Sequence, residues 1–213
     1  MSLGAGWYLG SGSSFCFGFF DWECGWLMEF ENLLEVASRE ELREWLVANC
    51  SEVSCCWVPI SISPRDGVLL YLDAVEEALC FGWIDGVKKK QGERLVQRLS
   101  PRRKKSNWTE LNKERVRRLE RLGLMTDCGR DVLPDMNEAS FVVDPEIEEQ
   151  LRLDVKVYEN FMSFPELYRR IRVDTIWQVR GQREVYENRI EKLIENTRLG
   201  KMYGAWNDGG RLG

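Results

Sequence analysis

Two short stretches of the chain, one on each side of a predicted hairpin, hold the side chains whose types and spacing could do chemistry. The first ends in the indole of Trp83 and the carboxylate of Asp85. The second contributes guanidinium, ammonium, hydroxyl and indole groups, from Arg102, Arg103, Lys105, Ser106 and Trp108. Guanidinium groups bind phosphate or carboxylate through paired hydrogen bonds, and free N–H groups at the start of the following helix favour an anion. Together the two stretches predict an anion-binding site.

Arg102 is the strongest candidate in this site. Two adjacent arginines at the exit of a strand point to opposite sides, so we expect one of Arg102 and Arg103 to be engaged and the other to be free. Trp83 and Trp108 either stack on a base or another flat ligand, or serve as core and hairpin packing. Asp85 either belongs to the site, or shapes a turn and pairs with Arg102. The residues alone leave these alternatives open.

Catalysis has few candidates in this chain. The sequence contains no histidine, which excludes Ser-His-Asp and Cys-His catalysis and every His-ligated metal site. Cys80, at an apolar helical position, is either a buried thiol or a nucleophile whose pKa a neighbouring cation must lower. Glu76 and Glu77 diverge on a helix and are expected on its outer side, so paired acid–base catalysis is not indicated. The sequence therefore assigns no catalytic residue, and it predicts no metal and no cofactor.

Charge is distributed unevenly along the chain. The net charge is −5, but residues 88–121 hold fourteen Lys and Arg against four Glu, a local charge of +10. We call residues 88–121 the basic block. It suggests an anionic partner, either nucleic acid or a nucleotide-like molecule, and a solvated charged surface explains it equally well. If about six phosphates of a duplex were neutralised, log K would fall with log salt at a slope near −5.

Local patterns place the secondary structure. Ser38 and Glu41 form a capping box, and residues 91–93 join two extended stretches in a hairpin. Apolar periodicity and Gly and Pro punctuation predict strands at 56–62, 83–90 and 94–99, and helices at 39–48, 72–81, 108–122, 146–153, 155–162, 166–179 and 184–199. Ser106 or Asn107 is expected to cap the helix at 108–122.

These elements predict an α+β fold: a small antiparallel sheet packed with helices, followed by a C-terminal helical region. The 213 residues suit one domain with a smaller appendage. We expect an α+β domain over 1–125 with an aromatic N-terminal segment, a linker over 126–144, a helical region over 145–204 and a flexible tail over 205–213.

The N-terminal segment and the cysteines bear on partners and on location. Residues 4–30 combine six glycines with nine aromatic residues, which predicts short strands that pack on the body or on a second copy, as in a homodimer. The seven cysteines lack the paired spacing of a disulfide framework, so reduced thiols in the cytoplasm are expected. No apolar run approaches 18 residues and no secretory signal pattern is present, so no membrane partner is predicted.

The two stretches that could do chemistry also carry a family resemblance. Residues 77–86 (Glu77-Ala78-Leu79-Cys80-Phe81-Gly82-Trp83-Ile84-Asp85-Gly86) and 100–108 (Ser100-Pro101-Arg102-Arg103-Lys104-Lys105-Ser106-Asn107-Trp108) resemble the YdeI/OmpD-associated, or bacteriocin-protection, family. The resemblance is placed mainly over 38–125. It continues more weakly into the C-terminal helices, at Tyr168-Arg169-Arg170-Ile171 and Arg189-Ile190-Glu191-Lys192-Leu193. The resemblance implies a fold and a site location, and it assigns no reaction, cofactor or catalytic residue.

Three functions from different classes are consistent with these observations. The first is a binding protein for a phosphate-bearing ligand at the basic hairpin and the loop that follows it. The second is a small-molecule enzyme that uses Cys80 or Asp85 beside Arg102. The third is a stress-protection interaction protein assembled through its aromatic N-terminal segment.

Overall fold

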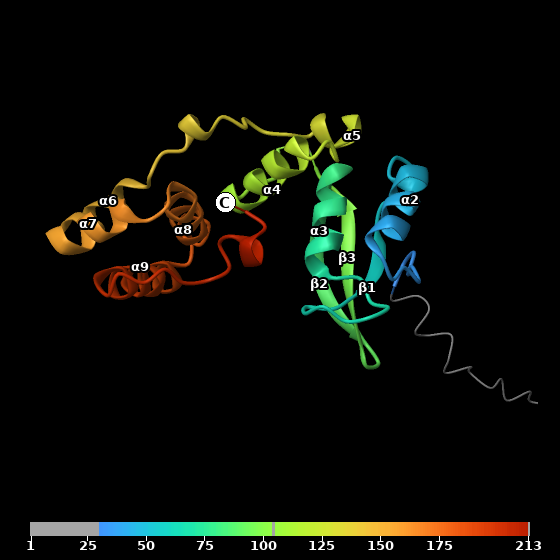
Figure 1. Ribbon diagram of the computed structural model, residues 1–213, viewed down its shortest axis with the longest axis horizontal. Helices are drawn as coiled ribbons and strands as arrows, with labels where there is room; N and C mark the ends of the chain where they lie inside the picture. Colours follow the sequence, from blue (N-terminus) through green and yellow to red (C-terminus); the bar gives the residue numbers. More distant parts are fainter. Residues whose placement is uncertain (1–29, 104, 213) are drawn as a thin grey trace, which may run out of the picture.

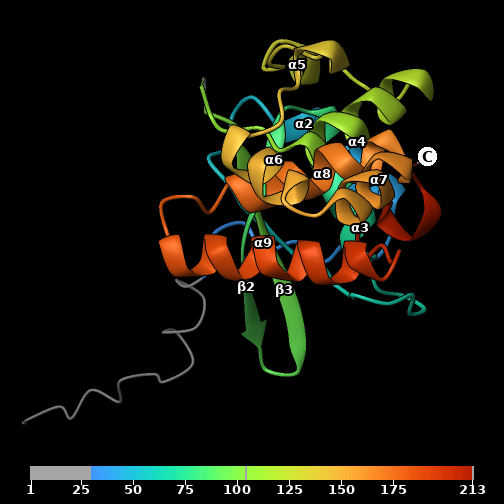
Figure 2. The same cartoon turned by 90° about the vertical axis from the view of Figure 1, so that its left-hand side faces the viewer.

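A three-stranded antiparallel sheet forms one half of the molecule in the computed structural model, which describes residues 30–103 and 105–212. The strands are β1 (Cys56–Ile60), β2 (Trp83–Gln91) and β3 (Arg94–Pro101), in the order β1-β3-β2. Cys56 is opposite Leu99 in one ladder, and Trp83 is opposite Pro101 in the other. The β2–β3 hairpin extends beyond the helices (Figure 2). The short strands predicted for residues 4–30, and the packing on a second copy predicted there, fall almost entirely outside the described residues.

Helices α2 (Arg39–Asn49), α3 (Tyr71–Cys80), α4 (Glu110–Arg121) and the short α5 (Asp127–Arg130) accompany the sheet (Figure 1). Ser38 caps α2 as predicted, since its side chain accepts a hydrogen bond from the Glu41 N–H at 3.2 Å. The main hydrophobic core lies among these helices and the sheet, and it includes Leu46, Val58 and Leu119. This half of the molecule therefore rests on one shared apolar core.

Four helices form the other half: α6 (Pro145–Arg152), α7 (Val155–Ser163), α8 (Glu166–Trp177) and α9 (Arg183–Arg198). They surround a second core that includes Phe161, Tyr168 and Leu193. Every strand and helix that the sequence predicts within the described residues is present, with bounds that agree within two residues. The α+β fold class is confirmed, while the four-part division of the chain remains a prediction. Among the described residues, no helix is long and apolar enough to cross a membrane.

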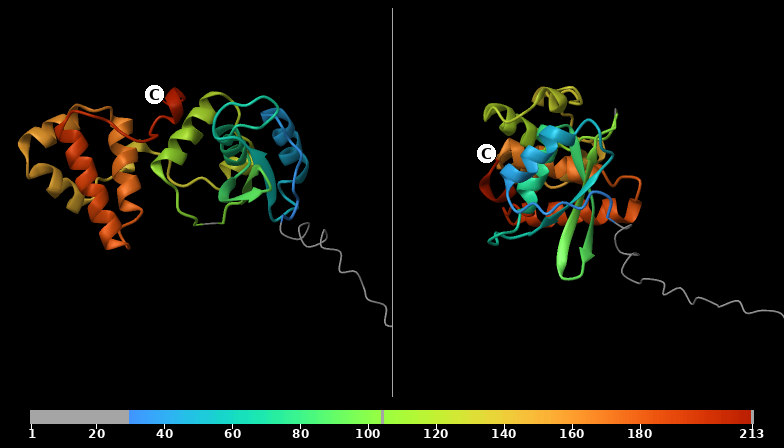
Figure 3. Two further views of the ribbon diagram at one scale, coloured as in Figure 1. Left: turned by 90° about the horizontal axis from the view of Figure 1, so that it is seen from below. Right: turned by 90° about the vertical axis from the view of Figure 1, so that its right-hand side faces the viewer.

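The segment between the two halves, predicted as a linker, arches from α5 to α6 (Figure 1) and contains a short 3-10 helix at Glu138–Ser140. Helix α4 lies between the sheet and the C-terminal helices (Figure 3) and contacts α8. The Arg170 guanidinium on α8 reaches the Glu114 carboxylate on α4 at 3.3 Å. Polar contacts across α4 therefore hold the two halves together.

Two sequence-based expectations, one about the C-terminal tail and one about α3, are wrong. The tail, predicted to be flexible, packs back on the first half: Leu212 is buried, and Arg211 pairs with Asp73 at 2.8 Å. Glu76 and Glu77, predicted on the outer side of α3, are both buried. The reason is that arginines from other elements of the fold surround these carboxylates and neutralise them.

Candidate anion-binding site at the exit of the hairpin

The loop that leaves β3 turns the Arg102 side chain inward. The Arg102 N–H donates to the Gly82 carbonyl at 2.9 Å, which fixes the start of the loop beside the end of α3. Only 6 % of Arg102 is exposed, and its guanidinium lies 3.6 Å from the centre of the Trp108 ring. Nη1 donates to the Asn107 carbonyl at 3.1 Å and approaches Ser106 Oγ at 3.4 Å. Arg102 is thus held between its own loop and an aromatic ring.

Among the described residues, the charge of Arg102 has no direct counter-ion. Its Nε and Nη2 are buried and have no hydrogen-bond partner in the described part of the chain, and no carboxylate there lies within ion-pair distance of the guanidinium. Burial lowers the pKa of Arg102 to about 10, while the Asp85 carboxylate acts in the opposite direction. The group therefore stays charged at neutral pH. A buried cation without a partner is costly, so this arrangement favours the arrival of an anion.

Among the described residues of the same loop, Arg103 and Lys105 are exposed cations. The Ser106 N–H donates to the Arg103 carbonyl at 3.0 Å, and Lys105 has a φ of +68°, so the chain makes a tight turn here. Arg102 is buried and Arg103 exposed, which agrees with the expectation that the two arginines face opposite sides. The part of these side chains in binding remains a prediction.

Asp85 and Trp83 are held by other contacts. The Asp85 carboxylate accepts a hydrogen bond from the Tyr71 hydroxyl at 2.7 Å, and it does not form the pair with Arg102 that was one of the two alternatives for this residue. Trp83 is 1 % exposed, donates from Nε1 to the Cys50 carbonyl at 3.2 Å and packs edge-on against Trp45. Trp83 is therefore a core residue and cannot stack on a ligand, because its apolar neighbours enclose it.

The predicted N–H donors at the start of α4 are already occupied. Thr109 caps the helix, in place of Ser106 or Asn107, by accepting from the Asn112 N–H at 3.2 Å. The Glu110 N–H donates to the Asp174 carboxylate of α8 at 3.0 Å. A carboxylate of the protein thus takes the place that the sequence assigns to a ligand anion. Because Asp174 is far from α4 in sequence, no local pattern reveals this contact.

Much of the basic block pairs with carboxylates of the protein itself. Every Lys and Arg of α4 has such a partner, in the pairs Lys113–Glu110, Arg115–Asp208, Arg117–Glu114, Arg118–Glu76 and Arg121–Glu114. On the hairpin, Arg94 pairs with Glu35 at 2.8 Å. Asp208, Glu76 and Glu35 lie outside the basic block and offset part of its charge of +10, whereas Glu110 and Glu114 are already counted in that sum. The loop cations Arg102, Arg103 and Lys105 form the core of the candidate site.

Sequence reasoning missed a second polar cluster near Asp85. The Arg115 guanidinium donates to both carboxylate oxygens of Asp208, at 2.6 and 2.8 Å. Tyr71, which donates to Asp85, also carries the Lys88 ammonium 3.5 Å from its ring centre. These residues come from α3, α4, β2 and the tail, so only folding brings them together. Within the described residues, no group of three Cys, Asp or Glu side chains is placed to hold a metal ion.

Cys80 is expected to be unreactive in the folded protein. Its side chain is fully buried, and burial raises the pKa of the thiol to about 12, with a further contribution from the Glu77 carboxylate. We expect iodoacetamide to modify Cys80 more than about a hundredfold more slowly in the folded protein than in urea. Exposed Cys128 is the internal control, and peptide mass spectrometry measures both rates. Rapid modification of Cys80 in the native state would restore the nucleophile hypothesis.

Two family models match the chain. Residues 140–200 match the model described as Bacteriocin-protection, YdeI or OmpD-Associated, and residues 34–132 match a Domain of unknown function (DUF8412). The family resemblance is confirmed by the first match. Its placement was wrong, because the sequence analysis located it mainly at 38–125, where the domain of unknown function matches instead. No curated protein and no solved structure matches the chain.

Proposed function

We propose that this chain, whose residues 140–200 match the bacteriocin-protection family, is a binding protein for a small phosphate-bearing molecule. The phosphate is held at the loop that leaves β3, by Arg102, Arg103 and Lys105. The observation that carries the proposal is the Arg102 guanidinium, which is buried on Trp108 with two unpartnered nitrogens and no carboxylate within ion-pair distance among the described residues.

A phosphate at this loop meets two exposed cations first. Arg103 and Lys105 offer hydrogen bonds at the surface, and Arg102 is the buried cation of the same loop. Because Nε and Nη2 of Arg102 are covered in this conformation, direct contact requires a shift of the loop. Even without that shift, the charge of Arg102 attracts the anion strongly, since the medium around a buried group has a low dielectric constant. Binding neutralises the buried cation, and this is the source of the affinity.

Two observations favour a small ligand over nucleic acid. The cations of α4 are paired within the protein. Trp83 is in the core and Trp108 is covered by Arg102, so neither ring offers a platform for a base.

The hairpin lysines lie outside the proposed small-ligand site. They are opposite Leu95, Val96 and Gln97, at least five residues from Arg102 along β3. At roughly 3.4 Å per residue that is about 17 Å, too far for one phosphate to contact both groups.

Titration calorimetry with adenosine monophosphate tests the proposal. Arg103→Gln and Lys105→Gln are each expected to weaken binding about tenfold or more, because a hydrogen bond to a charged group contributes roughly 1.5–3 kcal/mol. Arg102→Gln is expected to have the largest effect. Lys90→Gln is the matched control, because it removes one exposed cation of the basic block away from the loop, and it should leave the affinity unchanged.

The competing hypothesis, binding of nucleic acid, is tested by titrating the protein with labelled single-stranded and duplex oligonucleotides at two salt concentrations. If Arg102, Arg103 and Lys105 alone neutralised phosphates, the slope of log K against log salt would be about −3 instead of −5. Absence of binding to adenosine monophosphate, together with oligonucleotide binding at the steeper slope, would replace the small ligand by nucleic acid. If the three loop variants and the control bind the nucleotide equally well, the site is not at this loop.

A further inference from the structure

A cavity lies in the C-terminal half of the molecule, away from the loop that leaves β3. Its volume is about 330 Å³, within the range of small-molecule pockets. It lies among residues 138–143, α6, α7 and α8. Much of its wall is apolar or aromatic, from Phe141, Val143, Leu151, Tyr158, Phe161 and Met162. The cavity is therefore suited to the apolar body of a small molecule.

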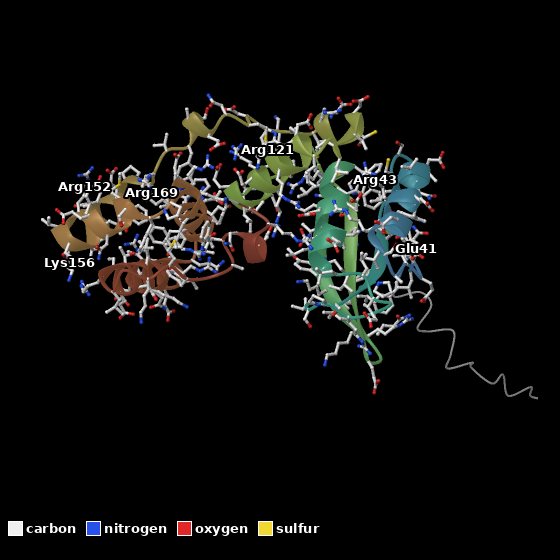
Figure 4. The ribbon with its side chains drawn as sticks, viewed as in Figure 1. Glu41, Arg43, Arg121, Arg152, Lys156 and Arg169 are labelled. Carbon is white, nitrogen blue, oxygen red and sulfur yellow. The ribbon has the colours of Figure 1, made fainter. Side chains whose placement is uncertain are left out.

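Arg169 of α8 lines the same cavity and lacks a good partner in the part of the chain that the structure describes. Its Nε is buried without a hydrogen bond, and Nη1 lies 3.2 Å from the thioether sulfur of Met162, which is only a weak acceptor. Within residues 30–103 and 105–212, no carboxylate lies within ion-pair distance of this guanidinium. Figure 4 shows Arg169 at the same end of the molecule as Arg152 and Lys156. A positive charge is thus available at an apolar wall.

The acidic residues of the cavity are largely engaged elsewhere. Glu138 pairs with Arg170, and Glu148 pairs with Arg152 at 2.6 Å. Glu166, one helical turn before Arg169, also lines the cavity and is exposed. It forms no hydrogen bond or ion pair with Arg169 in this structure, and its charge opposes an incoming anion. The charge that the cavity offers to a ligand at close range is therefore that of Arg169.

We propose that this cavity binds a small apolar carboxylate. The carboxylate accepts hydrogen bonds from the Arg169 guanidinium, and the hydrocarbon or aromatic body of the ligand packs on Phe161, Tyr158 and their neighbours. A guanidinium provides paired donors for a carboxylate, and burial of the apolar body supplies the remaining affinity. The site is independent of the proposed phosphate site, since the two share no residue.

Binding of 3-phenylpropanoate, compared with the uncharged 3-phenylpropan-1-ol, tests this assignment by calorimetry. The carboxylate is expected to bind at least about tenfold more tightly than the alcohol, because a charge-assisted hydrogen bond adds to the shared apolar contacts. Arg169→Gln should remove this preference and leave binding of the alcohol unchanged. Glu166→Gln should strengthen binding of the carboxylate, because it removes a repelling charge.

Two further variants test whether binding depends on Arg169 and on this cavity in particular. Lys156→Gln is the matched control: it removes an exposed cation of α7 that does not line the cavity, and it is expected to leave both affinities unchanged. Met162→Trp fills the mouth of the cavity at a side chain that is 47 % exposed, so it should block both molecules without unfolding the protein. Thermal unfolding curves confirm that each variant is folded. Equal affinities for acid and alcohol, retention of the preference in Arg169→Gln, or absence of binding by both molecules would each overturn the proposal.

Discussion

Replacing Glu76 by Ala is expected to lower the free energy of unfolding by about 3 kcal/mol or more, because it leaves several buried or half-buried arginines without their carboxylate. Glu76 is 1 % exposed. Its oxygens accept from Arg39 at 2.7 Å and from Arg118 at 2.9 Å, and Arg211 lies 3.3 Å away. These arginines come from α2, α4 and the tail. One carboxylate on α3 therefore connects three other parts of the fold.

Chemical denaturation followed by tryptophan fluorescence measures this loss. The matched control is Glu148→Ala, which removes an exposed carboxylate that pairs with Arg152 four residues along α6. That pair is accessible to solvent, so its loss should cost less than about 0.5 kcal/mol. If Glu76→Ala costs no more than the control, the buried network does not stabilise the native state.

Replacing Gly129 by Ala is expected to cost about 3 kcal/mol, because the added methyl group has no room. A Cβ at this position would lie 2.2 Å from the Cys80 carbonyl oxygen and 2.8 Å from the carbonyl carbon, both backbone atoms. The same carbonyl accepts from the Thr126 N–H at 3.1 Å and from Thr126 Oγ1 at 2.6 Å. To relieve the clash, α5 must move away from the end of α3 and lose these hydrogen bonds.

The midpoint of thermal unfolding reports this effect, with an expected decrease of roughly 6–12 °C for a chain of this length. Gly181→Ala is the matched control, since nothing lies within 4 Å of its added Cβ and its φ is not positive. Its stability should change by less than about 0.5 kcal/mol. Equal midpoints for the two variants would mean that α5 does not pack on α3 as described.

Local signals in the sequence were enough for the elements and the fold class. The capping box at Ser38 starts α2, and the turn at residues 91–93, where Gly92 has a φ of +59°, joins β2 to β3. Both features depend on residues close together in the chain, which is why the pattern reveals them. Likewise, the absence of histidine excludes several mechanisms without any structural information.

The candidate site was only partly visible in the sequence. The stretch with Arg102 could be identified, because two adjacent arginines after a strand indicate binding of phosphate or carboxylate. That Arg102 is buried and unpaired could not be predicted, because it depends on Trp108 and on the position of Asp85, which binds Tyr71 instead. The cavity at Arg169 was missed altogether, because its wall comes from several segments that have no pattern in common.

The sequence by itself determined how many charged side chains the protein has and where they lie along the chain. The tertiary structure decided which of them form ion pairs with each other. Arg115 meets Asp208 at a separation of 93 residues, and Arg211 meets Asp73 at 138. A local pattern cannot say which carboxylate a guanidinium will reach, since ion pairs form between side chains that packing brings together. For the same reason Glu76 and Glu77 are buried on a helix whose sequence placed them in water: their partners come from elsewhere in the fold.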